Sequence, residues 1–384
     1  MVSKRLQNVP TSGTVKIANI VSQLRESGVD ILSFSMGEPD FDTPRNIVDA
    51  CITSLEDRFT HYTSSLGIPE LREAIAAKTR RDNNILCSAD NVLVTPTKHA
   101  IFMIALAYLD PGDEVLLPDP AWVTYDACIR LAGAKPVHVP TNGSNGFRVT
   151  PEMVAEKVTK KTKMIILNSP CNPTGMVMPR SDLEGIADIC QDHNLRVLSD
   201  EIYERIIYEG EHVSIGSLDG MFDRTLTVSG LSKTYAMTGW RLGWLVAPEA
   251  DIMQVNKLQT HSITCCASFT QPAAIEAING PQEEIDRMVG EFRKRRDLMV
   301  NLINDTPGLS CDVPAGAFYC FPRYEMDMSS EDLAAHLLKE AHVAVTPGSA
   351  FGPSGEGCLR LSYAASEEQI IEGMGRIKDA LSKL

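Results

Sequence analysis

The sequence lacks several patterns that would place it in common classes of protein. Its ten cysteines include no Cys-x-x-Cys pair and no cluster with the spacing of a zinc site, and the adjacent Cys265 and Cys266 cannot chelate a metal by themselves. We therefore expect no bound metal ion. No Gly-x-Gly-x-x-Gly segment leads from a strand into a helix, which argues against a dinucleotide oxidoreductase. No internal repeat or low-complexity segment is visible.

Long apolar segments are also missing. The start of the chain, Met1 to Arg5, leads into no apolar signal core. The most apolar stretch, near Ala100 to Leu109, is about half as long as a membrane span. We expect a soluble, cytoplasmic protein with no membrane partner, whose cysteines are reduced and mostly buried as small hydrophobic residues.

Basic residues are in deficit, with 36 against 50 acidic ones and a formal net charge of −14. Such a surface argues against nucleic acid and anionic membranes as partners. Any anionic substrate must then be bound by local arginine or lysine side chains. At 384 residues and 43% hydrophobic content, the chain is too long for one simple core, so we expect two domains.

Short apolar runs alternate with helical patterns over much of the chain. The runs expected to be strands are 91–95, 114–117, 163–168, 195–200, 224–229 and 241–246. Helical patterns lie between several of them, as at 98–109 and 181–193, and two more helices are expected to start at Thr43-Pro44, with Thr43 as N-cap, and at Pro69. This alternation predicts the α/β class, with a mostly parallel sheet covered by helices on both faces.

The alternation of short strands and helices ends after about residue 279. A long charged helix over 281–304 leads to strand-like runs at 317–321, 343–346 and 358–363 and then to a terminal helix. We interpret this part as a smaller α+β domain, with the strand-like segment 30–35 packed on it. The predicted division is 45–280 for the large domain and 1–44 plus 281–384 for the small one.

Polar and charged residues follow four of the expected strands directly. These positions are Thr97-Lys98, Asn168 to Asn172, Asp200 and Lys233. In an open parallel sheet, ligands bind outside the carboxyl ends of the strands. We therefore expect these side chains to meet in one site.

Lys233 is the most informative of them. It lies among small and apolar residues in the segment Ser229 to Gly243, and poor solvation there lowers the pKa of an ammonium and frees its lone pair. Such an amine condenses with aldehydes. Arg241 could hold a phosphate on the same ligand, so the pair points to pyridoxal 5′-phosphate (PLP). The alternative is an ordinary surface lysine in a loop.

Six motifs in order resemble the class I/II aminotransferases of PLP fold type I, and most closely the aspartate aminotransferase branch of bacteria and archaea. The motifs are Gly37-Glu38-Pro39-Asp40, Tyr62-Thr63 before Gly67-Ile68-Pro69-Glu70, Asn168-Ser169-Pro170-Cys171-Asn172-Pro173-Thr174-Gly175, Asp200-Glu201-Ile202-Tyr203, Ser232-Lys233-Thr234 and Arg360-Leu361-Ser362. The resemblance runs from about Pro10 to the C-terminus. It implies a seven-stranded-type sheet and a smaller α+β domain.

The resemblance also assigns roles around the cofactor. Asp200 would pair with the pyridine nitrogen, Asn172 and Tyr203 would donate to the phenolic oxygen, and Trp122 would stack on the ring. Lys233, Asp200 and Tyr203 are thus the expected catalytic residues. Each also has a plainer explanation: Asp200 as a cap of the next turn, Asn172 as a turn residue, and Tyr203 or Trp122 as packing aromatics.

At the phosphate the chain departs from the family pattern. Arg241, Ser232 or Ser229, and the helix start at Thr97-Lys98 are the expected donors. Gly230 occurs where many relatives carry a serine, and Pro96, which has no N–H, occurs where relatives often have glycine. Tyr62 resembles a residue that reaches the phosphate from a neighbouring subunit, which implies a homodimer with shared active sites; as an alternative it is a buried aromatic.

The resemblance implies a ping-pong transfer of an amino group from an amino acid to a 2-oxo acid, with Lys233 as general base. Arg360, inside an apolar strand, would bind the substrate carboxylate as a bidentate fork, close to the backbone of Gly37, with Trp122 and Asn172 also lining the substrate site. Lys98, assisted by the Ser12 hydroxyl, matches the position that binds the distal carboxylate of aspartate. Aspartate and 2-oxoglutarate are the expected substrates.

Other functions stay open. Aromatic amino acids, alanine and prephenate are alternative substrates, because relatives with similar motifs accept them. A C–S lyase or a β-decarboxylase would share the same cofactor site. A PLP-sensing half of a transcription regulator would need a fused helix-turn-helix segment, for which the roughly ten residues before the matching region are too short.

Overall fold

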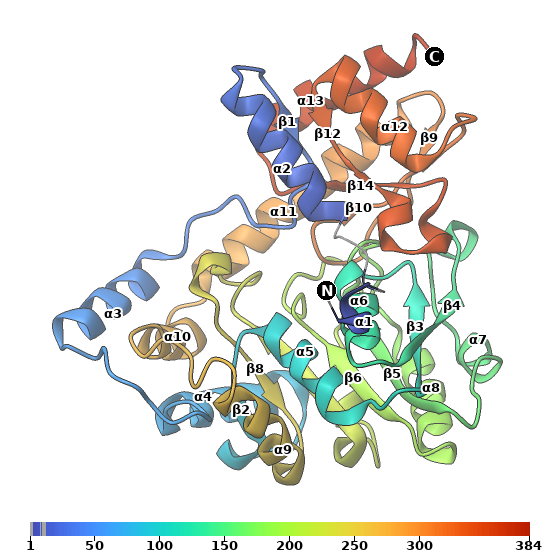
Figure 1. The fold of residues 1–384 in the computed structure, drawn as a ribbon. Coiled ribbons are helices and arrows are strands. Elements are labelled where there is room, and N and C mark those ends of the chain that lie inside the picture. Colours follow the sequence, from blue (N-terminus) through green and yellow to red (C-terminus); the bar gives the residue numbers. More distant parts are fainter. Residues whose placement is uncertain (1–2, 8, 10–12) are drawn as a thin grey trace.

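The computed structural model describes residues 3–7, 9 and 13–384, and its central feature is a seven-stranded sheet (Figure 1). The strand order is β2-β8-β7-β6-β5-β3-β4. The strands are β2 (Val92–Val94), β3 (Glu114–Asp119), β4 (Lys135–Pro140), β5 (Thr162–Asn168), β6 (Arg196–Asp200), β7 (Thr225–Gly230) and β8 (Gly243–Val246). The predicted fold class is confirmed.

The sheet is parallel except for β8, which is antiparallel to both of its neighbours, β2 and β7. The carboxyl ends of the other strands therefore lie at one edge, and the amino end of β8 joins them there. Neighbouring residues of β5 pack on opposite faces, with Ile165 in one apolar cluster and Ile166 in another. A strand buried on both faces must be apolar throughout, which explains its uninterrupted hydrophobic sequence.

Helices cover both faces of this sheet. Apolar side chains of α5 (Thr97–Tyr108), α6 (Val123–Leu131) and α9 (Glu249–Thr260) pack on one face. The other face is covered by α7 (Pro151–Ala155) and α8 (Arg180–Asp192), and near β2 and β8 by α4 (Pro69–Asn83) and α10 (Thr270–Asn279). α3 (Arg45–Glu56) lies beside α10. The predicted helices at 98–109 and 181–193 correspond to α5 and α8.

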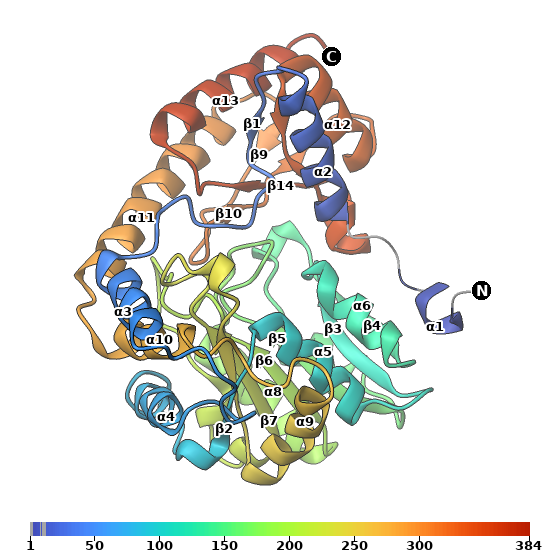
Figure 2. The ribbon, with the colours of Figure 1, turned by 60° about the vertical axis from the view of Figure 1, so that its left-hand side comes forward.

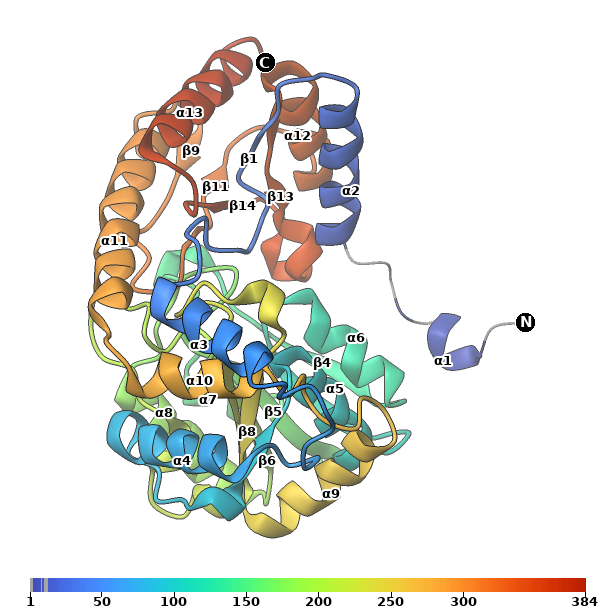
Figure 3. The same ribbon diagram turned by 90° about the vertical axis from the view of Figure 1, so that its left-hand side faces the viewer.

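A second group of elements lies at the strand-end edge of the large sheet, above it in Figures 2 and 3. Short strands dominate it: β1 (Leu32–Ser33), β9 (Leu309–Ser310), β10 (Tyr319–Cys320), β11 (Arg323–Tyr324), β12 (Val343–Ala344), β13 (Thr346–Pro347) and β14 (Leu359–Ser362). Its helices are α2 (Gly13–Glu26), α11 (Glu283–Asn304), α12 (Ser330–His336) and α13 (Glu367–Leu381), and the short α1 (Lys4–Gln7) lies apart from them. β1 pairs in parallel with β12, so the N-terminal strand packs where the sequence predicted.

Two local details differ from the sequence prediction, at Thr43 and at strand β4. Thr43 is not the N-cap of α3: Pro44 holds that position, and the Thr43 hydroxyl instead donates to the carbonyl of Ala236 at 2.7 Å. Strand β4, which the apolar pattern did not indicate, forms one end of the sheet. Among the described residues, no helix is long and apolar enough to cross a lipid bilayer.

Candidate active site

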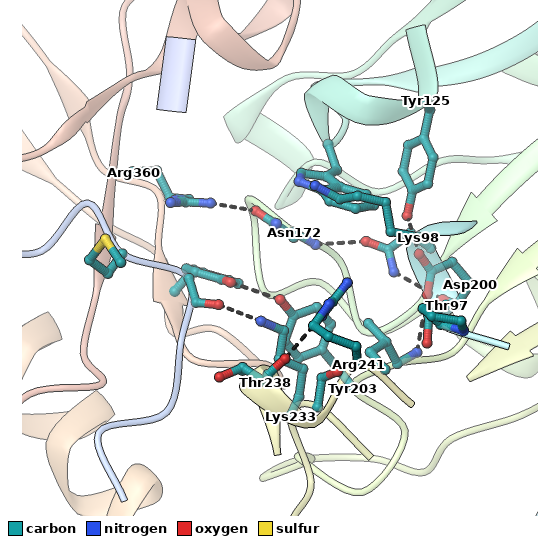
Figure 4. Close-up of a pocket in the computed structure, with 18 of the residues that line it drawn as sticks. Thr97, Lys98, Tyr125, Asn172, Asp200, Tyr203, Lys233, Thr238, Arg241 and Arg360 are labelled. Atoms are coloured by element: carbon teal, nitrogen blue, oxygen red, sulfur yellow. Dashed lines mark hydrogen bonds between the residues drawn. The ribbon is translucent and has the colours of Figure 1, made fainter. Parts of the chain in front are cut away.

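A cavity of about 450 Å³ opens at the strand-end edge of the sheet, between the two groups of elements (Figure 4). It has the size of an ordinary small-molecule site. Eleven of the thirteen predicted site residues line it: Gly37, Thr97, Lys98, Trp122, Asn172, Asp200, Tyr203, Ser232, Lys233, Arg241 and Arg360. Residues more than 300 positions apart in the sequence thus converge on one space.

Lys233 follows β7 and turns its amine into this cavity. Its Nζ donates to the neutral backbone carbonyl of Gly37. Burial lowers the pKa of Lys233 to about 8, and the positive charges of Arg360 and Lys98 act in the same direction, whereas the negative charge of Glu38 opposes them. A free amine is therefore accessible near neutral pH, as the sequence predicted.

Gly37 has no room for a side chain beside Tyr319. A Cβ atom at this position would lie 2.7 Å from the Tyr319 hydroxyl oxygen, a distance too short for a carbon atom. The backbone of Gly37 thus forms part of the cavity wall.

Asp200, at the end of β6, is the buried acid of the site, with 2% of its surface exposed. Its two partners are neutral: the Tyr125 hydroxyl donates to Oδ2 at 2.7 Å and the Ile202 amide to Oδ1 at 3.2 Å. Burial raises the pKa of Asp200 to about 6, although these two hydrogen bonds lower it. A cationic heterocycle is the kind of partner that this carboxylate would gain by binding a ligand.

Asn172 and Tyr203 add neutral polar groups to the wall of the same cavity. Asn172 Oδ1 accepts from Arg360 at 2.9 Å, and its backbone amide donates to Asn168 Oδ1 at 2.9 Å. The hydroxyls of Tyr203 and Tyr319 are 2.7 Å apart. Burial raises the pKa of Tyr203 well above its ordinary value, so the phenol keeps its proton and can donate it in a hydrogen bond.

Arg360 lies on β14 and is almost fully buried, with 3% exposed. Its partners are neutral oxygens: Asn172 Oδ1, the Ser35 carbonyl at 2.6 Å and the Thr346 hydroxyl at 3.4 Å. Its Nε is buried without an acceptor among the described residues. A buried guanidinium without a negatively charged partner is stabilised when an anion binds to it. The two parallel N–H groups of the guanidinium match the two oxygens of a carboxylate.

The opposite end of the cavity carries groups for a second anion. Arg241 precedes β8 with an exposed side chain, whose Nη1 donates to the Thr238 carbonyl at 2.9 Å. Its backbone is in the left-handed region (φ 55°), a conformation that is uncommon outside glycine. The first-turn amides of α5, at Thr97 and Lys98, have no acceptor within their own helix and favour an anion.

One departure from the family pattern, Gly230, has a steric reason at this end. A Cβ atom on Gly230 would lie 2.6 Å from the Thr97 hydroxyl and 2.8 Å from Gly243 Cα, so a serine at 230 has no room. Of the two serines considered, Ser232 lines the cavity. Ser229 does not, because its hydroxyl donates to Glu204 Oε1 at 2.8 Å on the other side of the strand.

One predicted residue, Tyr62, is not brought to the cavity, and the position of another is not described. Tyr62 is 87% exposed on this single chain and does not line the site. Ser12 lies outside the described residues. Lys98 lies at the rim with its Nζ 4.7 Å from the centre of the Trp122 ring, a cation–π contact. Partial burial and the nearby charge of Arg241 lower the pKa of Lys98.

The residues present fit PLP. The cavity offers an amine for the aldehyde, a buried acid for the pyridine nitrogen, neutral donors between them and cationic groups for the phosphate. Arg360 and its unpartnered Nε remain for a substrate carboxylate. Every part of the cofactor thus has a complementary group among the residues described above.

Sequence reasoning missed Tyr125 and Tyr319, which both touch predicted site residues. Tyr125 could have been found, because it follows Trp122 by three residues at the start of a helix and so shares its face. Tyr319 had no local signal. It reaches the site because β10 pairs with β14, which places Tyr319 opposite Ser362.

Comparison with known proteins agrees with this geometry. The family profile "Aminotransferase class I and II" matches residues 29–377. An aspartate aminotransferase of Pyrococcus abyssi is 44% identical over 386 residues, covering 99% of this chain and 98% of the relative. An aromatic-amino-acid aminotransferase of Thermococcus litoralis is 42% identical, covering 100% and 98%. The solved aspartate aminotransferase of Thermus thermophilus with maleate superposes with a TM-score of 0.95 at 38% identity, covering 99% of both chains.

Proposed function

Because this chain belongs to the class I and II aminotransferases, we propose that it transfers the amino group of aspartate to 2-oxoglutarate with PLP as cofactor. The observation that carries this proposal is the convergence of Lys233, Asp200 and Arg360 on one cavity. The first two suit the cofactor and the third suits the substrate.

In this proposal, Lys233 tethers the cofactor and Asp200 pairs with its pyridine nitrogen. Asn172 and Tyr203 donate to its phenolic oxygen, and Trp122 lies against its ring. Arg241, Ser232 and the amides of Thr97 and Lys98 hold the phosphate. When bound, PLP withdraws electrons from the substrate Cα and so weakens the Cα–H bond.

The protein supplies positioning and proton transfer. Arg360 binds the substrate carboxylate, next to the Gly37 backbone, and thereby orients the Cα–H bond toward Lys233. Once the substrate amine has replaced it on the cofactor, Lys233 Nζ is a free amine and removes the Cα proton as general base, a role that suits an amine with a pKa of about 8. Burial of Asp200, Tyr203 and Arg360 keeps water from competing for these contacts.

Aspartate is proposed because Lys98 is a cation at the rim of the substrate space and forms no ion pair with another described residue. A second substrate carboxylate needs such a partner when it leaves water. The Thermus thermophilus relative was solved with maleate, a dicarboxylate. Aromatic amino acids are the alternative, since the Thermococcus litoralis relative is named for them.

A panel of amino donors with 2-oxoglutarate tests which amino acid is the substrate. Consumption of 2-oxoglutarate alongside product formation separates amino-group transfer from a lyase reaction.

Lys98→Ala is expected to raise the KM for aspartate about 10- to 100-fold, as for the loss of a hydrogen bond to a charged group. The KM for an apolar amino acid should change little, because it has no distal carboxylate. Steady-state kinetics with both donors measure the difference. Equal effects on the two donors would refute the role of Lys98, whatever its effect on overall activity.

We also propose a homodimer in which Tyr62 reaches the phosphate of the neighbouring subunit. An apolar strip of Ile52, Leu55, Phe59 and Tyr62 is exposed along α3 and the segment after it, and such strips often mark interfaces. Light scattering coupled to gel filtration should give twice the mass of one chain. Tyr62→Phe should leave that mass unchanged and weaken PLP binding several-fold by removing one hydroxyl donor. A monomer that is fully active would contradict this proposal.

Two further assignments belong to the proposal. The large domain would comprise residues 45–280, since all seven strands of the main sheet lie within this range, and residues 1–44 plus 281–384 would form the small domain. A cytoplasmic location is supported by the ten cysteines, all of which are free thiols in the structure.

A further inference from the structure

A second set of charged side chains is buried behind Asp200, away from the cavity. It comprises Lys78 and Asn83 of α4, Glu201 and Glu204 after β6, and His212; we call these five residues the Glu201 cluster. The side chains of Lys78, Glu201, Glu204 and His212 are each less than a tenth exposed. None of the five lines the active-site cavity, so the proposed mechanism leaves them without a role.

Glu201 is the most completely bonded member. Its carboxylate is contacted by the Ser199 hydroxyl at 2.9 Å, the Ser214 hydroxyl at 2.6 Å, Asn83 Nδ2 at 3.1 Å and His212 Nε2 at 2.9 Å. Three of these partners donate to the carboxylate, and the imidazole of His212 completes its surroundings. The Glu201 side chain is therefore fixed in place by four contacts.

The remaining charges of the cluster balance one another. Lys78 Nζ lies 2.6 Å from Glu204 Oε2, with Asp82 at 3.9 Å on its outer side. Burial alone would raise the pKa of Glu204, but Lys78 and His212 outweigh it and lower this pKa to about 2. Burial likewise opposes protonation of His212, yet Glu201 and Glu204 raise its pKa. The cluster thus holds two carboxylates against an ammonium and an imidazole that is readily protonated.

A metal site is the obvious alternative, because ligand atoms of Glu201, Glu204 and His212 lie within 4.8 Å of one another. Lys78 argues against it. Its ammonium already contacts Glu204, where it supplies the positive charge that a metal ion would bring. The three residues therefore act as a charged support, not as a ligand set.

The cluster is joined directly to the catalytic strands. Glu201 follows Asp200, and successive side chains of a strand point to opposite faces, so Asp200 enters the cavity while Glu201 enters the cluster. The Glu201 amide donates to the Val228 carbonyl at 2.8 Å, and the Ser229 hydroxyl donates to the Glu201 carbonyl at 3.3 Å and to Glu204 at 2.8 Å. Glu201 thereby ties the end of β6, which carries Asp200, to the end of β7, which leads to Lys233. Its charge also adds to burial in raising the pKa of Asp200.

We propose that Glu201 is a positioning residue for the pyridine nitrogen of the cofactor, acting through Asp200, and that His212 limits the negative charge that Glu201 presents there. This inference rests on the function proposed above. It extends the site to residues that touch neither cofactor nor substrate.

Two variants of the holoenzyme, of which Glu201→Gln is isosteric, test it through charges of opposite sign. Glu201→Gln removes a negative charge, so the pH midpoint of the cofactor's visible absorbance change should fall by about half a unit or more. Glu201 and Glu204 raise the pKa of His212, so His212→Gln removes the positive charge that this imidazole carries when protonated and should raise the midpoint. Glu201→Gln should also weaken PLP binding several-fold, measured by titrating the apoprotein. General damage to the fold would move both variants in the same direction.

Unchanged midpoints in both variants, or shifts of the same sign, would overturn the inference while the proposed function stands. If Glu201→Gln does not fold, Ser214→Ala removes one donor to Glu201 and keeps all charges. It should weaken PLP binding in the apoprotein titration, because Glu201 then holds the end of β6 less firmly, and unchanged binding would again refute the positioning role. A wild-type protein without any visible cofactor band would refute the proposed function itself, and this inference with it.

Discussion

Lys233→Ala is expected to abolish amino-group transfer and the visible absorbance of the bound cofactor together. The variant loses both the amine that tethers the aldehyde and the base that removes the Cα proton. General bases alone contribute about 10²- to 10⁴-fold, so kcat should fall by at least about 10⁴-fold when both roles are lost. Stopped assays of aspartate with 2-oxoglutarate and an absorbance spectrum measure the two effects.

A matched control is Lys257→Ala on α9, where the exposed lysine side chain bonds only to Gln254 among the described residues. It should retain both the spectrum and the activity of the wild type. Retained turnover or a retained visible band in Lys233→Ala would show that another group holds the cofactor.

Arg360→Ala is expected to reduce kcat/KM for both the amino acid and the 2-oxo acid by about 10²- to 10³-fold, which corresponds to the loss of a buried charge pair. Both substrates carry a carboxylate beside the reacting carbon, and the described chain offers Arg360 no anion of its own. Arg360→Lys keeps the charge but loses the bidentate fork, so it should recover only part of the activity. Steady-state kinetics with each substrate varied in turn give these values.

The cofactor spectrum separates this effect from a damaged site. Since Lys233 and Asp200 are untouched, both Arg360 variants should keep the visible band. Arg148→Lys, at a surface arginine paired with Asp182, serves as the control for loss of an arginine as such. Unchanged kcat/KM in Arg360→Ala would mean that the substrate carboxylate binds elsewhere.

Local sequence patterns predicted most of the large sheet, because strands buried on both faces must be apolar throughout. Strand β4 was not predicted, and the reason is physical. It contains Pro136 and Pro140 and has charged or polar residues at Lys135 and His138. As one end of the sheet, it can accept prolines that an inner strand could not.

The site residues were predictable where the chemistry resides within one short motif. Lys233 and Asp200 follow strands of the large sheet, and the strand-end rule brings them together. Arg360 lies on β14, outside that sheet, and was predicted from its motif and the resemblance. Tyr319 and the partners of Glu201 were not predictable, because they reach their neighbours only through long-range pairing. The backbone of Arg241 was also inaccessible to pattern reasoning: its predicted strand began at 241, whereas β8 begins at Gly243 and Arg241 adopts a left-handed conformation.

The central claim is that the amine of Lys233 binds the aldehyde of PLP, and chemical trapping tests it most directly. The wild-type protein would be incubated with PLP, reduced with borohydride, digested and examined by mass spectrometry. We predict one phosphopyridoxyl group per chain, on the peptide that contains Lys233, with loss of the visible band on reduction. A label on another lysine, or no label at all, would contradict this assignment.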